Sequence, residues 1–155
     1  MTSPTERLRA LGLDLPAPDA VLDWHLPVAD DDGLLWVSGQ VPFVDGRLLH
    51  TGPLTSEADV AVGYDCARRA AAHVLARLAR AAGSLEQIAA VPKLTVFVAS
   101  APQFTLQPEV AHGASELIHE VLGDAGRHAR SAVGVAALPL GAPVEVEAVA
   151  RVRRG

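Results

Sequence analysis

One arginine and one glutamate in the C-terminal part of the chain have the chemistry to bind and activate a small substrate. Arg130 comes directly before the apolar run 131–138, and a guanidinium binds a carboxylate through two parallel hydrogen bonds at any working pH. Glu145 lies inside the apolar run 144–153, where burial would raise its carboxyl pKa and make the carboxylate a better general base. Glu147 lies on the same face, and the residues alone do not separate the two. The alternatives are a surface arginine at a strand edge and a carboxylate in solvent or in a salt bridge between subunits.

Other reactive side chains are better explained as structural. His112, Glu116 and His119 stand at i, i+4 and i+7, a spacing that can bind zinc, but a third histidine or a known metal motif is missing. We interpret the three as the polar face of a helix. Cys66 lies on an apolar helical stripe and is expected to be a small buried hydrophobe rather than a nucleophile. Ser38 is not part of a G-x-S-x-G turn. We therefore expect no metal and no cofactor.

Two long helices and several short strands are expected to position these residues. A capping box begins a short N-terminal helix at Ser3-Pro4-Thr5-Glu6. The main helices are predicted over 57–82, ended by Gly83, and over 107–122. Strands are predicted near 22–28 and over 34–38, 47–50, 93–99, 131–138 and 144–153. This order indicates an α+β fold of two layers, with one mixed β-sheet and the two main helices packed on one face.

Alternation along the last predicted strand assigns its two faces. The face expected to meet the helices is entirely apolar and carries Val144, Val146, Ala148 and Ala150. The opposite face carries Glu145, Glu147, Val149 and Arg151. A half-apolar sheet face with no helix over it must be open or covered by another subunit, so the pattern predicts an oligomer.

Composition limits the class of protein. The chain has 155 residues, 50% of them apolar, which suits one ordinary domain. The formal net charge is −5, and the only basic cluster is Arg151, Arg153 and Arg154, so nucleic acid is not an expected partner. Cys66 is the only cysteine, which fits a reducing cytoplasm. No apolar run approaches the ~20 residues that span a bilayer, and the N-terminus is charged where a signal peptide would be apolar. We expect a soluble, cytoplasmic protein without membrane partners.

Five segments, in order and spacing, resemble the RidA family of reactive-intermediate deaminases, also called YjgF-like. They are Trp36-Val37-Ser38-Gly39-Gln40-Val41-Pro42, Ala81-Ala82-Gly83, Val91-Pro92-Lys93-Leu94-Thr95-Val96-Phe97-Val98, Ala129-Arg130-Ser131-Ala132-Val133, and Leu138-Pro139 with Val144-Glu145-Val146-Glu147-Ala148. The resemblance covers about residues 22–152 and implies that residues 1–155 form a single RidA-like domain.

The resemblance implies a chorismate-mutase-like fold, a homotrimer and ligand clefts between subunits. It also implies hydrolysis of reactive 2-imino or enamine acids to 2-keto acids and ammonia without a cofactor. An alternative is a non-catalytic protein of the same fold that binds a small carboxylate or keto acid. An endoribonuclease activity also attaches to the family by name, and the net charge of −5 argues against it.

The family's site residues are carried over by position. Arg130 resembles the arginine that holds the substrate carboxylate, and Glu145 resembles the carboxylate that positions the attacking water. Ser38 and Gly39 resemble part of the cleft wall. Either Trp24 or His25 falls near an aromatic cleft position.

Three positions depart from the family's active members. Ala132 stands where those members often have a cysteine two residues after the arginine, and it is expected at the substrate. Ala111 and Ala114 align with an asparagine and a tyrosine at the start of the second main helix. The chain therefore resembles a divergent subgroup, and these departures favour the binding alternative more than in a typical member.

Overall fold

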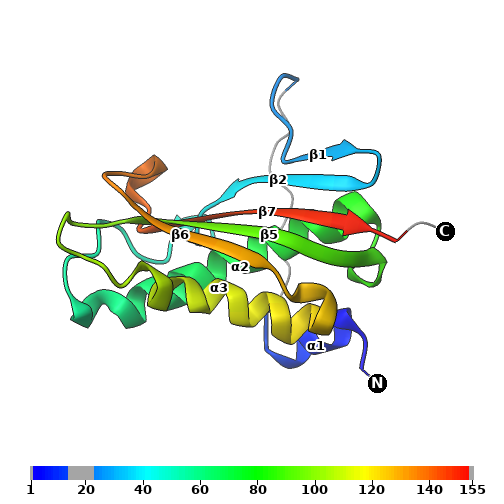
Figure 1. Cartoon of the computed structure of the whole chain (residues 1–155), viewed down its shortest axis with the longest axis horizontal. Helices are drawn as coiled ribbons and strands as arrows, with labels where there is room; N and C mark the ends of the chain where they lie inside the picture. Colours follow the sequence, from blue (N-terminus) through cyan, green and yellow to red (C-terminus); the bar gives the residue numbers. More distant parts are fainter. Residues whose placement is uncertain (1, 14–22, 154–155) are drawn as a thin grey trace.

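A mixed sheet of five strands forms one layer of the protein (Figure 1). The computed structural model describes residues 2–13 and 23–153. The strands of the sheet lie in the order β1-β2-β7-β5-β6, and all neighbours are antiparallel except β5 and β6. Their bounds are β1 Val28–Asp31, β2 Leu34–Gln40, β5 Ile88–Ala99, β6 Ala129–Val135 and β7 Val144–Val152. A separate hairpin pairs β3 (Phe43–Val44) with β4 (Arg47–Leu48).

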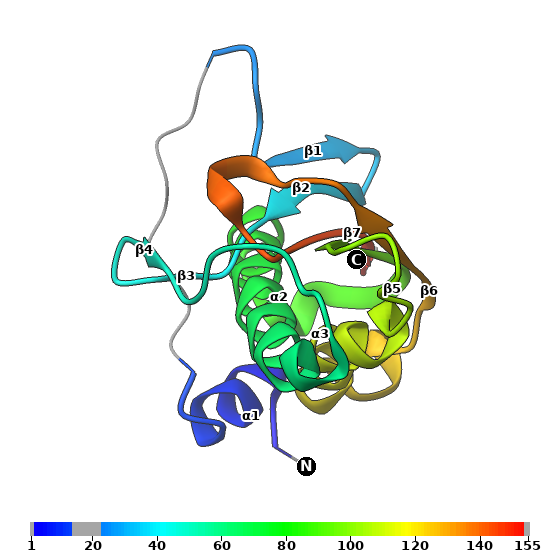
Figure 2. The ribbon, with the colours of Figure 1, turned by 90° about the vertical axis from the view of Figure 1, so that its left-hand side faces the viewer.

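Helices α2 (Val60–Ala82) and α3 (Gln107–Leu122) pack side by side on one face of this sheet (Figure 2). The apolar stripe of α2 is buried, with Cys66, Ala70, Val74 and Leu78 inaccessible to solvent. On β7 the residues facing the helices are Val144, Val146, Ala148 and Ala150, all buried as the alternation predicted. The expected α+β two-layer fold is confirmed.

A short helix, α1 (Pro4–Ala10), packs against the end of α3. Its predicted capping box is present, because the Glu6 amide donates to Ser3 Oγ at 3.2 Å and the Ser3 amide donates to Glu6 Oε2 at 2.6 Å. Arg7 Nε donates to the carbonyl of Val121 at 2.7 Å and ties α1 to the last turn of α3. None of the described helices is long and apolar enough to cross a membrane.

Several predicted strand ends were wrong, and the pairing between strands explains the main difference. β5 begins at Ile88, five residues before the predicted start, because its pairing with β7 continues through register shifts on either side of Ala90. Pro92 is exposed and lies in the irregular part of this pairing, where a missing N–H is tolerated. β6 ends at Val135 rather than at 138. β1 starts at Val28, where the strand predicted over 22–28 was expected to end, and residue 22 lies outside the described residues.

Candidate functional site

A β-bulge in β2 brings Gly39 against the carboxylate of Glu145. Val37 pairs with Ala148 and Gln40 pairs with Val146, so two residues of β2 stand opposite one residue of β7. A Cβ atom built on Gly39 would lie 1.7 Å from Glu145 Oε1, far inside any van der Waals contact. The carboxylate therefore occupies the space that only a glycine leaves open.

The environment of Glu145 suits a base. Burial and, second, the charge of Glu147 raise the pKa of the Glu145 carboxyl group above its ordinary range. Glu145 pairs with Phe97 and Glu147 pairs with Thr95 on β5, so both carboxylates lie on the sheet face opposite the helices. A carboxylate that is partly desolvated holds a proton more tightly and is a stronger acceptor for a proton from water.

A pocket of about 200 Å³ opens beside the bulge. Its wall includes Ser38, Gly39 and His25, three of the positions expected at the cleft. Ser38 Oγ donates to the carbonyl of Leu26 at 2.7 Å, so the hydroxyl joins β2 to the segment before β1. The side chain of Trp24 is 83% exposed, and its ring centroid lies 6.5 Å from that of His25. In one copy of the chain, His25 rather than Trp24 borders the pocket.

A buried polar network supports the bulge from the helix side, and the sequence reasoning missed it. Gln40 Nε2 donates to the carbonyls of Ser38 and Gly39 at 2.9 and 3.2 Å, and its Oε1 accepts from Arg77 Nε at 3.2 Å. His73, whose pKa is lowered by burial, contacts the carbonyl of Phe43 at 2.9 Å. The signal was the presence of a histidine and an arginine beside the apolar stripe of α2, where most residues are aliphatic.

Arg130 lies on the other side of the sheet. It pairs with Leu94, which belongs to the buried core, so its side chain projects from edge strand β6 towards α3. Arg130 Nη1 donates to Ser115 Oγ at 3.0 Å, and Nη2 donates to the carbonyl of Pro108 at 3.3 Å. Two acceptors on α3 thus hold a guanidinium that still has further N–H groups for a ligand.

The predicted residues therefore form two groups within one copy of the chain. Ser38, Gly39 and Glu145 lie together at the bulge in β2. Ala132 pairs with Val96 of the core, so it shares the helix-facing side of β6 with Arg130. The strand order puts β5 between β7 and β6, and the two groups occupy opposite faces of the sheet. One copy alone does not bring Arg130 and Glu145 to a common ligand.

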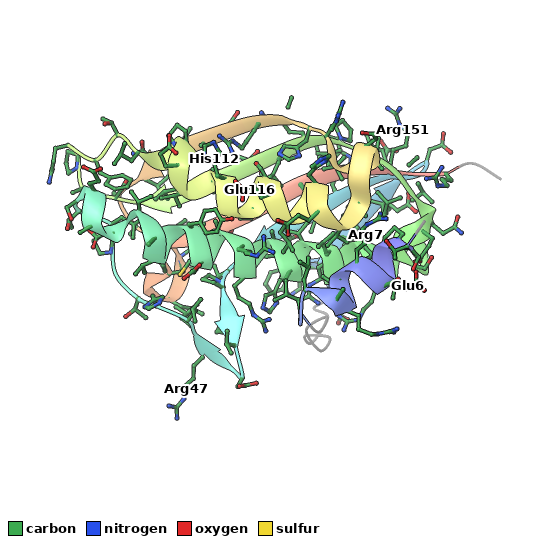
Figure 3. All side chains as sticks on the ribbon, turned by 90° about the horizontal axis from the view of Figure 1, so that it is seen from below. Glu6, Arg7, Arg47, His112, Glu116 and Arg151 are labelled. Carbon is green, nitrogen blue, oxygen red and sulfur yellow. The ribbon has the colours of Figure 1, made fainter. Side chains whose placement is uncertain are left out.

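The other reactive side chains have separate surroundings. On α3, His112 lies 3.3 Å from Glu109, Glu116 accepts from the hydroxyl of Tyr64, and His119 Nδ1 contacts the carbonyl of Gly123 at 3.0 Å (His112 and Glu116 in Figure 3). Within residues 2–13 and 23–153, three or more His, Cys, Asp or Glu side chains do not gather as metal ligands. Burial raises the pKa of the Cys66 thiol to about 12, which suits the predicted structural role.

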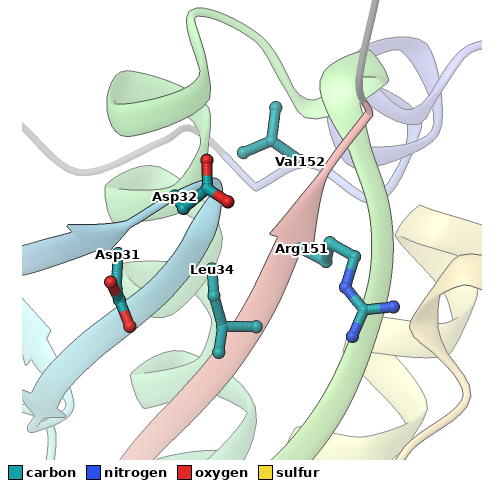
Figure 4. Close-up of a pocket in the computed structure, with 5 residues that line it drawn as sticks. All are labelled: Asp31, Asp32, Leu34, Arg151 and Val152. Atoms are coloured by element: carbon teal, nitrogen blue, oxygen red, sulfur yellow. The ribbon is translucent and has the colours of Figure 1, made fainter.

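A hollow of about 670 Å³ lies at the far end of the sheet, where β1, β2 and β7 meet. Leu34 lies between Asp31 and Arg151 there, with Asp32 and Val152 completing the wall (Figure 4). It contains none of the predicted site residues.

Comparisons with known proteins agree with this geometry. A family described as "YjgF/chorismate_mutase-like, putative endoribonuclease" matches residues 5–151. Protein TCP17 of Trypanosoma cruzi is 45% identical over 143 residues, which cover 92% of this chain and 89% of that protein. The crystal structure of Atu1372 from Agrobacterium tumefaciens, a protein of unknown function, is 42% identical with a TM-score of 0.87, covering 95% of this chain and 91% of that one. A "putative endoribonuclease" from Shewanella oneidensis is 32% identical with a TM-score of 0.91, covering 97% and 100%. The resemblance seen in the sequence is confirmed, and the chain belongs to the YjgF/chorismate-mutase-like family.

Proposed function

We propose that the protein hydrolyses reactive 2-imino or enamine acids to 2-keto acids and ammonia in a cleft between subunits, without a cofactor. The observation that carries this proposal is the carboxylate of Glu145, which is held over Gly39 with a raised pKa. Membership of the YjgF/chorismate-mutase-like family supports a general role of that family, and the deaminase activity is what the resemblance to RidA proteins implies. Ser38 and Gly39, expected at the cleft wall, border a pocket of about 200 Å³ beside the bulge.

The proposed reaction uses one water molecule. Glu145 accepts a proton as the water oxygen attacks the imine carbon, and a tetrahedral carbinolamine forms. Glu145 then returns its proton to the nitrogen of the carbinolamine. The carbon–nitrogen bond breaks as the hydroxyl group gives up its proton to Glu145, so that ammonia leaves and a 2-keto acid remains. A carboxylate whose pKa is raised above its ordinary range is more basic than usual, which suits the first step.

Arg130 has a role in this proposal only if a second copy of the chain is present. Its guanidinium would bind the substrate carboxylate from one subunit, while Glu145 would deliver water from the next. The sheet face that would be covered carries exposed apolar side chains, with Trp36 51% and Val133 42% accessible. We propose a homotrimer with these faces towards its centre, and light scattering that shows a monomer at micromolar concentration would contradict it.

The experiment that tests the activity is a deaminase assay with imines generated from several amino acids. Glu145→Gln should keep ligand binding, because the amide fills the same space, while turnover falls on the order of 10²–10⁴-fold. Glu147→Gln is the matched control on the same strand face and should do much less. If both variants match the wild type, Glu145 has no catalytic role.

A binding protein of the same fold is the second candidate. Ala132 stands where active relatives often have a cysteine, and Ala111 and Ala114 are fully buried in α3 rather than at a cleft. These small residues leave fewer groups to act on a bound ligand. A wild type that binds 2-keto acids in calorimetry but turns over no imine would favour this candidate.

RNA cleavage is a poorer candidate for this chain, although the family description includes it. The net charge is −5, and Glu145 and Glu147 on the open sheet face would repel phosphate. We propose a small carboxylate as the partner and the cytoplasm as the compartment, which suits a chain whose only cysteine is a buried free thiol. Failure to bind RNA at any salt concentration is the expected result.

A further inference from the structure

A chain of three hydrogen-bonded groups lies behind Arg130. Ser115 Oγ accepts from Arg130 Nη1 at 3.0 Å and also lies 3.0 Å from His128 Nε2. The other ring nitrogen of His128, Nδ1, lies 2.6 Å from the carbonyl of Gly126. Ser115 comes from α3, whereas His128 directly precedes β6. These hydrogen bonds therefore join a helix and a strand at the edge of the sheet.

The partners fix the direction of every hydrogen bond in this chain. A carbonyl oxygen can only accept, so His128 Nδ1 carries the proton that bonds Gly126. Burial, followed by the charges of Arg130 and His119, lowers the pKa of His128 and keeps its ring neutral at pH 7. Nε2 is then an acceptor, and the Ser115 hydroxyl donates to it. The Ser115 oxygen is left to accept from Arg130.

Without His128, the Ser115 hydroxyl would have a different acceptor for its hydrogen bond. A serine inside a helix ordinarily donates to the carbonyl four residues earlier, which for Ser115 is that of Ala111. His128 instead directs the hydroxyl towards the strand. The two residues His128 and Arg130 are separated by one residue, so at the start of an extended strand their side chains project to the same side.

We infer that Ser115 and His128 are positioning residues that hold the guanidinium of Arg130 in one orientation for a ligand carboxylate. This inference rests on the proposed role of Arg130 as the carboxylate-binding group. An arginine side chain has several freely rotating bonds, and immobilising it before the ligand arrives removes a cost from binding. The carbonyl of Pro108, 3.3 Å from Nη2, supplies the second fixed contact.

The first test needs no ligand. In ¹⁵N NMR spectra, His128 should be the tautomer protonated at Nδ1, which is the rarer form of a free imidazole. The Arg130 guanidinium should show separate Nη signals, because its rotation is restricted. Ser115→Ala should merge these Nη signals. His128 should stay protonated at Nδ1, because its hydrogen bond to the Gly126 carbonyl remains. An Nε2-protonated ring, or Nη signals unchanged in Ser115→Ala, would overturn the inference.

The second test measures binding of pyruvate, the simplest 2-keto acid, by calorimetry at pH 7. Ser115→Ala and His128→Ala should each raise Kd roughly 3- to 10-fold, and the double variant should be no worse than the single ones, since all break one chain. Ser115→Thr keeps the hydroxyl and should restore binding. His112→Gln is the matched control, because His112 also lies on α3 but contacts Glu109 and is not part of the hydrogen bonds to Arg130.

The two tests separate the inference from the proposed function. If the wild type binds no 2-keto acid while the NMR signature is present, the proposed role of Arg130 fails and the orientation of its side chain stands. If the wild type binds pyruvate and Ser115→Ala binds it equally well, the proposed site stands and the positioning role fails. Circular dichroism of Ser115→Ala checks that α3 remains folded, which is expected because alanine is the better helix former.

Discussion

The Glu145 carboxylate fills the space above Gly39 that a Cβ atom would need, at a distance of 1.7 Å. Position 39 is not in the left-handed region of backbone conformation, so the glycine is required by this close approach rather than by its φ angle. The bulge at this point in β2 is therefore coupled to the placement of the proposed base.

We expect Gly39→Ala to lower turnover without unfolding the protein. The new methyl group would push the Glu145 carboxylate aside, and a displacement of about 1 Å at a reacting group can cost on the order of 10²-fold in rate. The same substitution made on top of Glu145→Gln should lower turnover little further, because the two changes act on one group. Wild-type turnover in Gly39→Ala would show that the observed contact is not needed for the reaction.

Substitution of Arg130 is expected to remove ligand binding. Loss of a charge-assisted bidentate contact costs more than about 1.5 kcal/mol, so Arg130→Ala should raise the Kd for 2-keto acids by more than about tenfold. Arg127→Ala is the control, since Arg127 is three residues away, has a side chain 75% exposed and pairs with Asp124. Unchanged affinity in Arg130→Ala, measured by calorimetry, would make Arg130 a structural residue.

The acid side of the pH profile is expected to report the pKa of Glu145. The proposed base must be ionised, so kcat/KM should fall as pH falls through a pKa that lies above the ordinary glutamate range. Glu147 contributes to that increase in pKa, so Glu147→Gln should move the acid midpoint to lower pH. Glu116→Gln, on the opposite side of the molecule on α3, should leave the midpoint in place. A midpoint that does not respond to Glu147→Gln would assign the acid limb to another group.

Much of the fold could be predicted from local signals. The bounds of α3 at 107–122 and the end of α2 at Gly83 follow from apolar periodicity and helix-ending glycines, which act over a few residues. The faces of β7 follow from alternation within one strand. The bulge at Ser38 and Gly39 was not predicted, because it depends on how β2 aligns with a strand that is distant in the sequence.

The candidate site was harder to predict for the same reason. Alternation shows which residues of one strand share a face, but it does not relate the faces of two strands without their register. The opposite placement of Arg130 and Glu145 follows only from the pairing of both strands with β5. His128 and Ser115 were missed because α3 and the start of β6 meet through tertiary packing. His128 stands two residues before Arg130, and this spacing was the available signal.

The thiol of Cys66 is expected to be inert in the folded protein. The side chain is fully buried in the core, and burial raises its pKa to about 12, so little thiolate is present at pH 8. A disulfide reagent such as Ellman's reagent should react only as fast as the protein unfolds, and at once in denaturant. Rapid reaction of the native protein would show that the helix layer opens locally around Cys66.

Each proposed site would take Arg130 and Glu145 from different copies of the chain. These residues lie on opposite faces of one sheet, so a shared ligand would be bound by Arg130 of one copy and Glu145 of another. At a substrate concentration below the wild-type KM, Arg130→Ala and Glu145→Gln should each retain less than about one tenth of the wild-type turnover alone. If the two variants are unfolded and refolded together in equal amounts, random assortment in a symmetric trimer should give intact sites at about one quarter of positions.

Turnover of the mixture should therefore recover to about one quarter of the wild-type value. Each variant refolded alone is the control, because neither supplies both residues and neither should gain activity. Mixing without unfolding should recover turnover only as fast as subunits exchange. The wild type refolded in the same way must be active. If the mixture then forms trimers but stays inactive, either each site takes both residues from one copy or one of the two residues is not used. Recovery would instead show that a site is completed by a neighbouring subunit, which the separation of Arg130 and Glu145 across the sheet requires.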